Sequence, residues 1–137
     1  MTDWQIINRV PTAAEHRAIA VQVGWEHAFD WDTLDDSLAG SQLGVTALID
    51  DLPVGMGRVV GDGVKYFYVQ DLAVAPGQQR TGLGTVLLQN LLDQIAGMAP
   101  STAFVGLFAT PEGDALYRAN GFSGGDMAGM FRLVESG

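Results

Sequence analysis

The stretch DLAVAPGQQRTGLGTVLL, Asp71–Leu88, changes from a strand pattern to a helix pattern within a few residues. Apolar residues recur at helical spacing from Leu83 onward, and a further apolar segment follows at 103–108. A strand, a helix and a second strand in this order form a crossover, which places the two strands side by side and parallel. The stretch therefore predicts an α/β protein with at least one parallel strand pair.

The rest of the chain predicts short strands, with helices before and after a central group of three. The predicted strands are residues 4–10, 42–50, 54–60, 64–74, 103–108 and 129–134. The predicted helices are residues 12–23, 32–39, 83–96 and 113–120. The order β-α-α-β-β-β-α-β-α-β describes a mixed, mostly antiparallel sheet with helices on both faces. We find no linker or repeat, so we expect one domain over residues 1–137.

Local signals mark the ends of these helices. Thr12 and Glu15 form a capping box, and Asp32 can cap the second helix, which Gly40 would end. Gly97 is expected to stop the helix that begins near Leu83.

Gly82 and Gly84 lie where the first turn of that helix leaves its amide groups without partners. Free amides and the positive end of the helix dipole attract anions, and missing side chains let a diphosphate approach the backbone. Gln79, Arg80 and Thr81 would add side-chain donors. The alternative is that the glycines only permit a tight turn, and spacing alone leaves both readings open.

Composition excludes several classes of function. The net charge is −9, and ten of the sixteen acidic residues precede Val64, which disfavours nucleic acid as a partner. The chain has no cysteine, and its two histidines, His16 and His27, show no ligand spacing, so we expect no metal site. No basic leader and no apolar run of about 20 residues is present. We therefore expect a cytoplasmic protein that neither spans nor binds a membrane.

Two segments together resemble the GNAT N-acetyltransferases. Gln79-x-x-Gly82-x-Gly84 is similar to the acetyl-CoA-binding motif of that family, Gln/Arg-x-x-Gly-x-Gly/Ala. ALYRANGF, Ala115–Phe122, is similar to a second family segment, in which a helix carrying Leu-Tyr is followed by Gly-Phe. The predicted element order also fits the family from Trp4 to Val134.

The resemblance implies acetyl-CoA as co-substrate and no metal. In the family the cofactor enters a gap between two splayed parallel strands, which here are Tyr66–Val74 and Ala103–Phe108. The implied cofactor-binding residues are Leu72, Ala73, Val74, Gln79, Arg80, Thr81, Gly82, Leu83, Gly84, Thr85, Thr110 and Tyr117. Thr110 departs from the family, since many members carry Asn at this position.

The resemblance also implies catalytic roles for two residues. The amide of Leu72 would polarise the thioester carbonyl, and Tyr117 would protonate the departing CoA thiolate. A phenol has an ordinary pKa of about 10, so it keeps its proton at neutral pH. The alternative is that Tyr117 only packs its helix against the sheet.

The base that deprotonates the acceptor amine is not evident. Alternation predicts Tyr66, Tyr68, Gln70 and Leu72 on one face of their strand. Some relatives place histidines at the positions of Tyr68 and Gln70. Asp71 is expected on the other face unless a bulge redirects it. We favour a water chain leading to a carboxylate over any single base.

The acceptor is expected to bind near the segment GWEHAFDWDTLDD, residues 24–36. The candidate substrate-binding residues are Trp25, Phe29, Trp31, Arg58, Tyr68 and Gln70. Aromatic rings and carboxylates suit an amine with an apolar group, although Trp25 and Phe29 could equally be core residues. Arg58 could pair with a substrate carboxylate or with an aspartate of the loop. We expect both histidines to have surface roles.

We therefore expect an N-acetyltransferase that moves an acetyl group from acetyl-CoA to a primary amine of a small molecule in a ternary complex. A protein lysine or N-terminus is an alternative acceptor, and a non-catalytic acyl-CoA sensor is an alternative function. Many family members pair, so a homodimer is also compatible with the resemblance.

Overall fold

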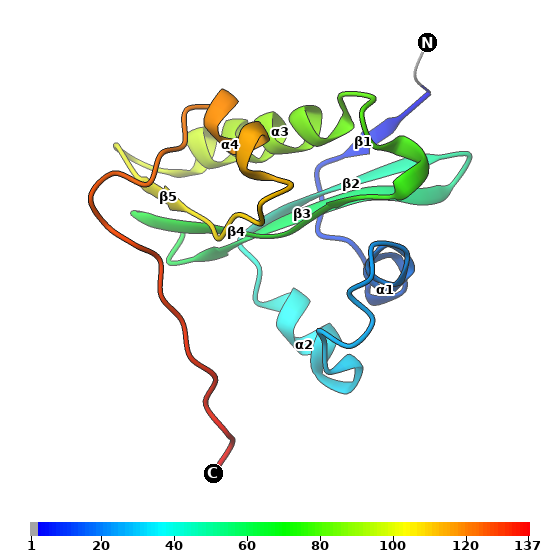
Figure 1. The fold of residues 1–137 in the computed structure, drawn as a ribbon, viewed down its shortest axis with the longest axis horizontal. Helices are drawn as coiled ribbons and strands as arrows, with labels where there is room; N and C mark the ends of the chain where they lie inside the picture. The colour runs from blue at the N-terminus through cyan, green and yellow to red at the C-terminus, as the bar shows by residue number, and fades with distance from the viewer. Residues whose placement is uncertain (1–2) are drawn as a thin grey trace. The chain divides into compact units, whose positions relative to one another are not determined.

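A computed structural model of the chain describes residues 3–137. Its residue contacts divide into two compact units, one up to Leu107 and one from Phe108 onward (Figure 1). The first unit holds a single five-stranded sheet and the helices around it. The second unit holds one short helix. Each unit is described by itself below.

The sheet runs in chain order. Its strands are β1 (Gln5–Ile7), β2 (Leu43–Ile49), β3 (Leu52–Gly61), β4 (Tyr66–Val74) and β5 (Phe104–Gly106). Neighbouring strands are antiparallel except β4 and β5, which are parallel. The chain between these two strands contains the long helix α3, so the predicted crossover is confirmed.

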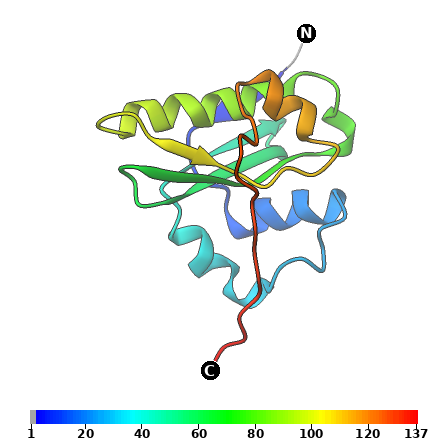
Figure 2. The same ribbon diagram turned by 60° about the vertical axis from the view of Figure 1, so that its left-hand side comes forward.

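Helices cover both faces of the sheet, as predicted. Helix α3 (Leu83–Met98) lies on one face, and α1 (Ala13–Gln22) and α2 (Leu34–Ala39) lie on the other (Figure 1 and Figure 2). The α3 side holds the larger apolar core, which includes Val45, Val59, Phe67, Leu87 and Leu91. The α1 side holds a smaller cluster of Ile19, Met56 and Ala73.

Short-range hydrogen bonds fix where α1 and α2 begin. The capping box of α1 is confirmed, because Thr12 accepts from the Glu15 amide while Glu15 accepts from the Thr12 amide. Arg9 also binds the Glu15 carboxylate, at 2.6 Å. Ahead of α2, Asp30 rather than Asp32 supplies the cap, and it caps the 3-10 turn Trp31–Thr33.

The terminal strand predicted at residues 129–134 is wrong. The second unit contains α4 (Asp114–Ala119), and no strand follows it among the described residues. Met130, Phe131, Leu133 and Val134 are all exposed. Strand propensity needs a neighbouring strand and a face to bury, and this segment has no ladder partner in the part of the chain that the structure describes.

Of two glycines in the first unit, Gly97 does not end a helix as predicted, whereas Gly44 permits a close backbone contact. Gly97 does not end α3, which continues to Met98 with Ala99 as its C-cap. Gly44 on β2 instead lies against the backbone of Val10, since a Cβ there would be 2.6 Å from the Val10 Cα atom. The residues after β1 can therefore cross β2 only because position 44 has no side chain.

Substituting these two glycines should change stability in opposite directions. Gly44→Ala forces backbone apart and should lower the free energy of unfolding by about 1–3 kcal/mol. Gly97→Ala adds a better helix former where a Cβ meets no atom within 4 Å, so it should raise stability by up to about 1 kcal/mol. Urea unfolding of the two variants measures both changes, and a destabilised Gly97→Ala would contradict the open environment of that position.

Candidate active site

The parallel strands β4 and β5 are paired over only part of β4. Their ladder joins Tyr66, Phe67 and Tyr68 to Phe104, Val105 and Gly106, whereas β4 continues to Val74. Ala73 and Val74 remain paired with β3 on their other side. The β5-facing edge of β4 beyond Tyr68 is therefore free of strand pairing within the described residues, as expected for splayed strands.

The chain after β4 leads directly to the start of α3 through two left-handed residues. Arg80 has φ 64° and Gly82 has φ 91°. Gly82 is the N-cap residue of α3, and no side chain caps this end. The amide of Val86 makes the first helical bond, to the Gly82 carbonyl at 3.1 Å. The amides of Leu83, Gly84 and Thr85 therefore have no carbonyl of the preceding turn to bind.

Side chains of this loop mostly stabilise the loop itself. The Gln79 amide group donates to the Val74 carbonyl at 3.4 Å, and the Thr81 hydroxyl donates to the Gln78 carbonyl. Trp4 donates its indole N–H to the Gln78 side chain at 3.0 Å. Arg80, Thr81 and Gly82 are exposed. Of Gln79, Arg80 and Thr81, only Arg80 has a side chain without a hydrogen bond to this loop among the described residues.

A β-bulge interrupts the β3–β4 ladder next to the splay. Gln70 pairs with Arg58 and Ala73 pairs with Met56, so Asp71 and Leu72 together face the single residue Gly57. Asp71 adopts a left-handed φ of 57°. The bulge reverses the alternation, so Leu72 packs against the core on the α3 side. The prediction that Leu72 shares a face with Tyr66, Tyr68 and Gln70 is therefore wrong, and Asp71 turns toward α1.

Asp71 is the centre of a buried charge network. Its Oδ2 atom lies 3.0 Å from Nε2 of His16 on α1 and 2.9 Å from Nε of Arg58 on β3. His16 is fully buried, so the expected surface role of this residue is wrong. His27 is exposed, as expected. The helical period contained the missed signal, because His16 shares a face with the buried Ile19 and Ala20.

Arg58 donates four hydrogen bonds to protein groups. Beyond its bond to Asp71, it donates to the Ser37 carbonyl at 3.0 Å, the Ser41 hydroxyl at 3.1 Å and the Ser37 hydroxyl at 3.2 Å. The sequence left a substrate carboxylate and a loop aspartate open as partners, and the structure assigns the β4 aspartate instead. Arg58 thus ties β3 and β4 to the end of α2.

Opposing effects set the protonation of Asp71. Burial alone raises the pKa of its carboxyl group, but hydrogen bonds from His16 and Arg58 and their charges outweigh it, so the pKa lies below the ordinary value of 3.8. An ionised carboxylate only accepts hydrogen bonds, so Nε2 of His16 must carry the proton it shares. Nδ1 of His16 is buried without a hydrogen-bond partner in the described residues.

Aromatic rings of the predicted acceptor loop surround His16. Phe29 meets the imidazole edge-on with ring centroids 4.7 Å apart, and Trp31 lies at 6.3 Å. Trp25 lies 6.4 Å from Phe29. Arg17 stacks over Trp31 at 4.9 Å. The three predicted aromatic residues therefore form one cluster, which packs on the charge network.

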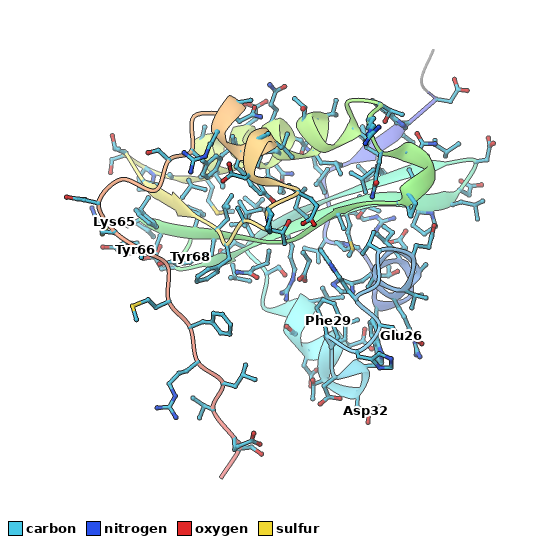
Figure 3. The ribbon with its side chains drawn as sticks, viewed as in Figure 1. Glu26, Phe29, Asp32, Lys65, Tyr66 and Tyr68 are labelled. Carbon is cyan, nitrogen blue, oxygen red and sulfur yellow. The ribbon has the colours of Figure 1, made fainter. Side chains whose placement is uncertain are left out.

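The β4 candidates lie on the same side of the sheet as this cluster. Gln70 faces Arg58 in the ladder, and Tyr68 lies two residues earlier on the same face. Tyr66 and Tyr68 each pack beside Phe104, at 6.0 and 6.1 Å, and all three rings are exposed. Figure 3 shows Tyr66 and Tyr68 projecting from β4, with Phe29 beside α2.

Tyr117 and Thr110 belong to the second unit. Tyr117 on α4 packs against Phe122, with ring centroids 5.9 Å apart, and burial raises the pKa of its phenol above 10.0. The Thr110 hydroxyl accepts the Gly113 amide at 3.3 Å, ahead of α4. The phenol therefore keeps its proton over the whole neutral range.

No group of three or more potential ligand side chains capable of holding a metal ion occurs among residues 3–137. In the same residues no helix has the length and apolar character to cross a bilayer.

Removing Arg58 should destabilise the protein strongly at neutral pH. Arg58→Met keeps bulk but leaves the Asp71 carboxylate buried without its cation, and we expect the free energy of unfolding to fall by about 3 kcal/mol. Because the folded-state pKa of Asp71 is lowered, the network stabilises the fold fully above pH 3.8 and less as the pH falls below it. The difference from wild type should therefore shrink in acid.

Urea unfolding at several pH values measures this effect. Arg118→Met is the matched control, because Arg118 forms an exposed ion pair with Asp114. It should change stability by less than about 0.5 kcal/mol. An Arg58→Met variant as stable as this control would show that the network contributes nothing.

Solved structures of other proteins share this fold. A protein of unknown function from meticillin-resistant Staphylococcus aureus, described as a probable acetyltransferase, is 26% identical with a TM-score of 0.86, covering 96% of this chain and 99% of that one. A GNAT family acetyltransferase from Streptococcus pneumoniae is 28% identical with a TM-score of 0.81, covering 97% and 99%.

Among curated proteins, serotonin N-acetyltransferase 2 of rice (Oryza sativa subsp. japonica, chloroplastic) is 35% identical over 71 residues. The match covers 52% of this chain and 34% of the rice protein, so it spans about a third of that relative's length. The family model described as "Acetyltransferase (GNAT) family" matches residues 10–122, which is most of the chain. The splayed strands, the uncapped helix and this match together show that the protein belongs to the GNAT acetyltransferase family.

Proposed function

We propose that this acetyltransferase moves an acetyl group from acetyl-CoA to a primary amine of a small molecule. Two observations carry the proposal together: the edge of β4 beyond Tyr68, which has no strand partner among the described residues, and the uncapped start of α3. A strand edge suits the amide-bearing pantetheine arm, and a helix N-terminus suits a diphosphate.

The residues present fit coenzyme A. At the exposed Gly82, a Cβ would meet no atom within 4 Å, so the approach to the helix start is open. The amides from Arg80 to Thr85 would hold the diphosphate, with the Arg80 side chain at the rim. The backbone of Leu72, Ala73 and Val74 would pair with the pantetheine arm. Bound there, acetyl-CoA supplies a thioester whose acetyl group is transferred to the amine.

Two groups of the chain would assist the transfer. The Leu72 amide lies in the bulge at the splay, where it would donate to the thioester oxygen as negative charge develops. The amine nitrogen would attack the carbonyl carbon and lose a proton to solvent, the C–S bond would break, and Tyr117 would give its phenol proton to the leaving thiolate and regain one from solvent. Burial raises the pKa of Tyr117, so the phenol carries its proton at neutral pH.

The acceptor side favours an amine with an aromatic or apolar group. Trp25, Phe29 and Trp31 form one cluster, and Tyr68 and Gln70 face the same side of the sheet. The name of the rice relative, a serotonin N-acetyltransferase, supports an arylalkylamine in particular. Release of CoA thiol from acetyl-CoA with a panel of amines tests the proposal, and activity only on peptides would shift the acceptor to protein. A cytoplasmic location and a homodimer stay predictions.

A charge placed at Gly82 should weaken cofactor binding without unfolding the protein. Asp and Asn both tolerate the left-handed conformation better than other residues with side chains. Asp also stabilises a helix N-terminus but repels a diphosphate. We expect Gly82→Asp to weaken CoA binding at least about tenfold more than Gly82→Asn does. Calorimetric titration with CoA measures both, and equal affinities would contradict a diphosphate at this position.

Removing the phenol proton of Tyr117 should lower turnover selectively. Tyr117→Phe keeps the ring and its packing on Phe122 but cannot protonate the thiolate, so kcat should fall about a hundredfold or more. The dissociation constant for acetyl-CoA should stay within about twofold of wild type. Steady-state kinetics with the best amine of the panel, together with calorimetry, separates the two effects. An unchanged kcat would remove Tyr117 from the mechanism.

A further inference from the structure

One oxygen of the Asp71 carboxylate is not used by the network that holds this residue. His16 and Arg58 both bind Oδ2. Oδ1 takes no hydrogen bond from the described residues, and it is not among the buried atoms without a partner. About 12% of the Asp71 side chain remains exposed. The carboxylate is thus held firmly on one side and open on the other.

The position of Asp71 is maintained against the preference of its backbone. A left-handed φ of 57° is unfavourable for a residue with a side chain, and such conformations gather at functional sites. The network stabilises this conformation through groups on α1 and β3, and Arg58 connects it to α2. Asp71 also directly precedes Leu72, the proposed donor to the thioester oxygen. A group bound at Oδ1 would therefore lie close to the reacting carbonyl.

The nearby segment would attract a cation. Residues 24–36 carry Glu26, Asp30, Asp32, Asp35 and Asp36 and contain no lysine or arginine. This segment supplies the aromatic cluster that packs on His16. The charged groups that face Asp71 directly are His16 from α1 and Arg58 from β3. All the donors of Arg58 that point away from Asp71 bind Ser37 and Ser41.

We propose that Oδ1 of Asp71 binds the protonated amine of the acceptor, so that the enzyme selects cationic amines over neutral molecules of the same shape. The inference rests on the proposed function, because it concerns the acceptor of that reaction. A carboxylate in a partly dry site attracts an ammonium group much more strongly than an exposed one does. Asp71, rather than the exposed aspartates of the loop, then determines where the amine is held.

Asp71 acts in this role as an anchor and not as the base. Its pKa lies below the ordinary value, so it is a poor acceptor of the amine's proton. The ammonium form binds, one proton passes to water, and the free amine nitrogen then attacks the thioester carbon. The carboxylate stays ionised throughout and keeps its bonds to His16 and Arg58.

The first test replaces the outward-facing oxygen and removes the charge of the carboxylate. Asn is tolerated at left-handed positions, and its side-chain oxygen can keep both inner hydrogen bonds while an NH2 group replaces Oδ1. We expect Asp71→Asn to raise KM for phenethylamine at least about tenfold while the affinity for CoA is unchanged. Asp51→Asn is the matched control, since Asp51 also has a left-handed φ, of 65°, in the exposed turn between β2 and β3. It should leave KM unchanged.

The second test first compares two ligands on the wild-type protein, and this comparison does not depend on how the variant folds. The protein is loaded with CoA, which carries no acetyl group, and titrated calorimetrically with phenethylamine and with 2-phenylethanol, a neutral molecule of similar size. Wild type should prefer the cation by about tenfold or more, and Asp71→Asn should lose this preference.

Equal affinities in wild type, no binding of phenethylamine, or a preference that survives in Asp71→Asn would overturn the inference. The proposed function fails on different evidence, namely absent CoA binding or absent thiol release with every amine tested. An enzyme that acetylates amines but ignores their charge would therefore refute the anchor alone.

Discussion

The hydrogen bonds that hold Asp71 connect most of the first unit. One carboxylate oxygen accepts hydrogen bonds from His16 on α1 and Arg58 on β3. Arg58 also donates hydrogen bonds to Ser37 and Ser41 around the end of α2. The β4 bulge needs this network, because a left-handed aspartate would otherwise be unfavourable. In turn, the bulge moves Leu72 to the α3 side. The network around Asp71 therefore stabilises the bulge, and the bulge determines which side of the sheet the side chains of Asp71 and Leu72 face.

The two proposed halves of the site differ in what builds them. The cofactor half is almost wholly main chain, from the unpaired edge of β4 to the amides at the start of α3. The acceptor half is made of side chains, chiefly aromatic residues of the segment between α1 and α2 and charged groups beneath them. The cofactor half therefore depends on backbone conformation, as at Gly82, whereas the acceptor half depends on which side chains are present.

Features that depend on local interactions could be predicted from the sequence. The Thr12 and Glu15 capping box, the apolar face of α3 and the crossover to β5 involve residues close in the chain or a regular period. The positions of Asp71 and His16 depend on strand register and on a contact between residues 55 positions apart in the chain. The prediction of the final strand is wrong because strand propensity carries no information about a missing ladder partner. Gly97 predicts a helix end, although nothing in its surroundings forces the helix to end there.

The backbone character of the cofactor half has a consequence for divergence and for engineering. Because main-chain amides survive most substitutions, the segment from residue 24 to residue 36 could be exchanged for that of another enzyme without altering how the nucleotide is held. Such a graft would need to retain Ser37 and Ser41, since they receive the guanidinium group of Arg58. New acceptor preferences could therefore be introduced by replacing one contiguous segment while His16, Arg58 and Asp71 are left unchanged.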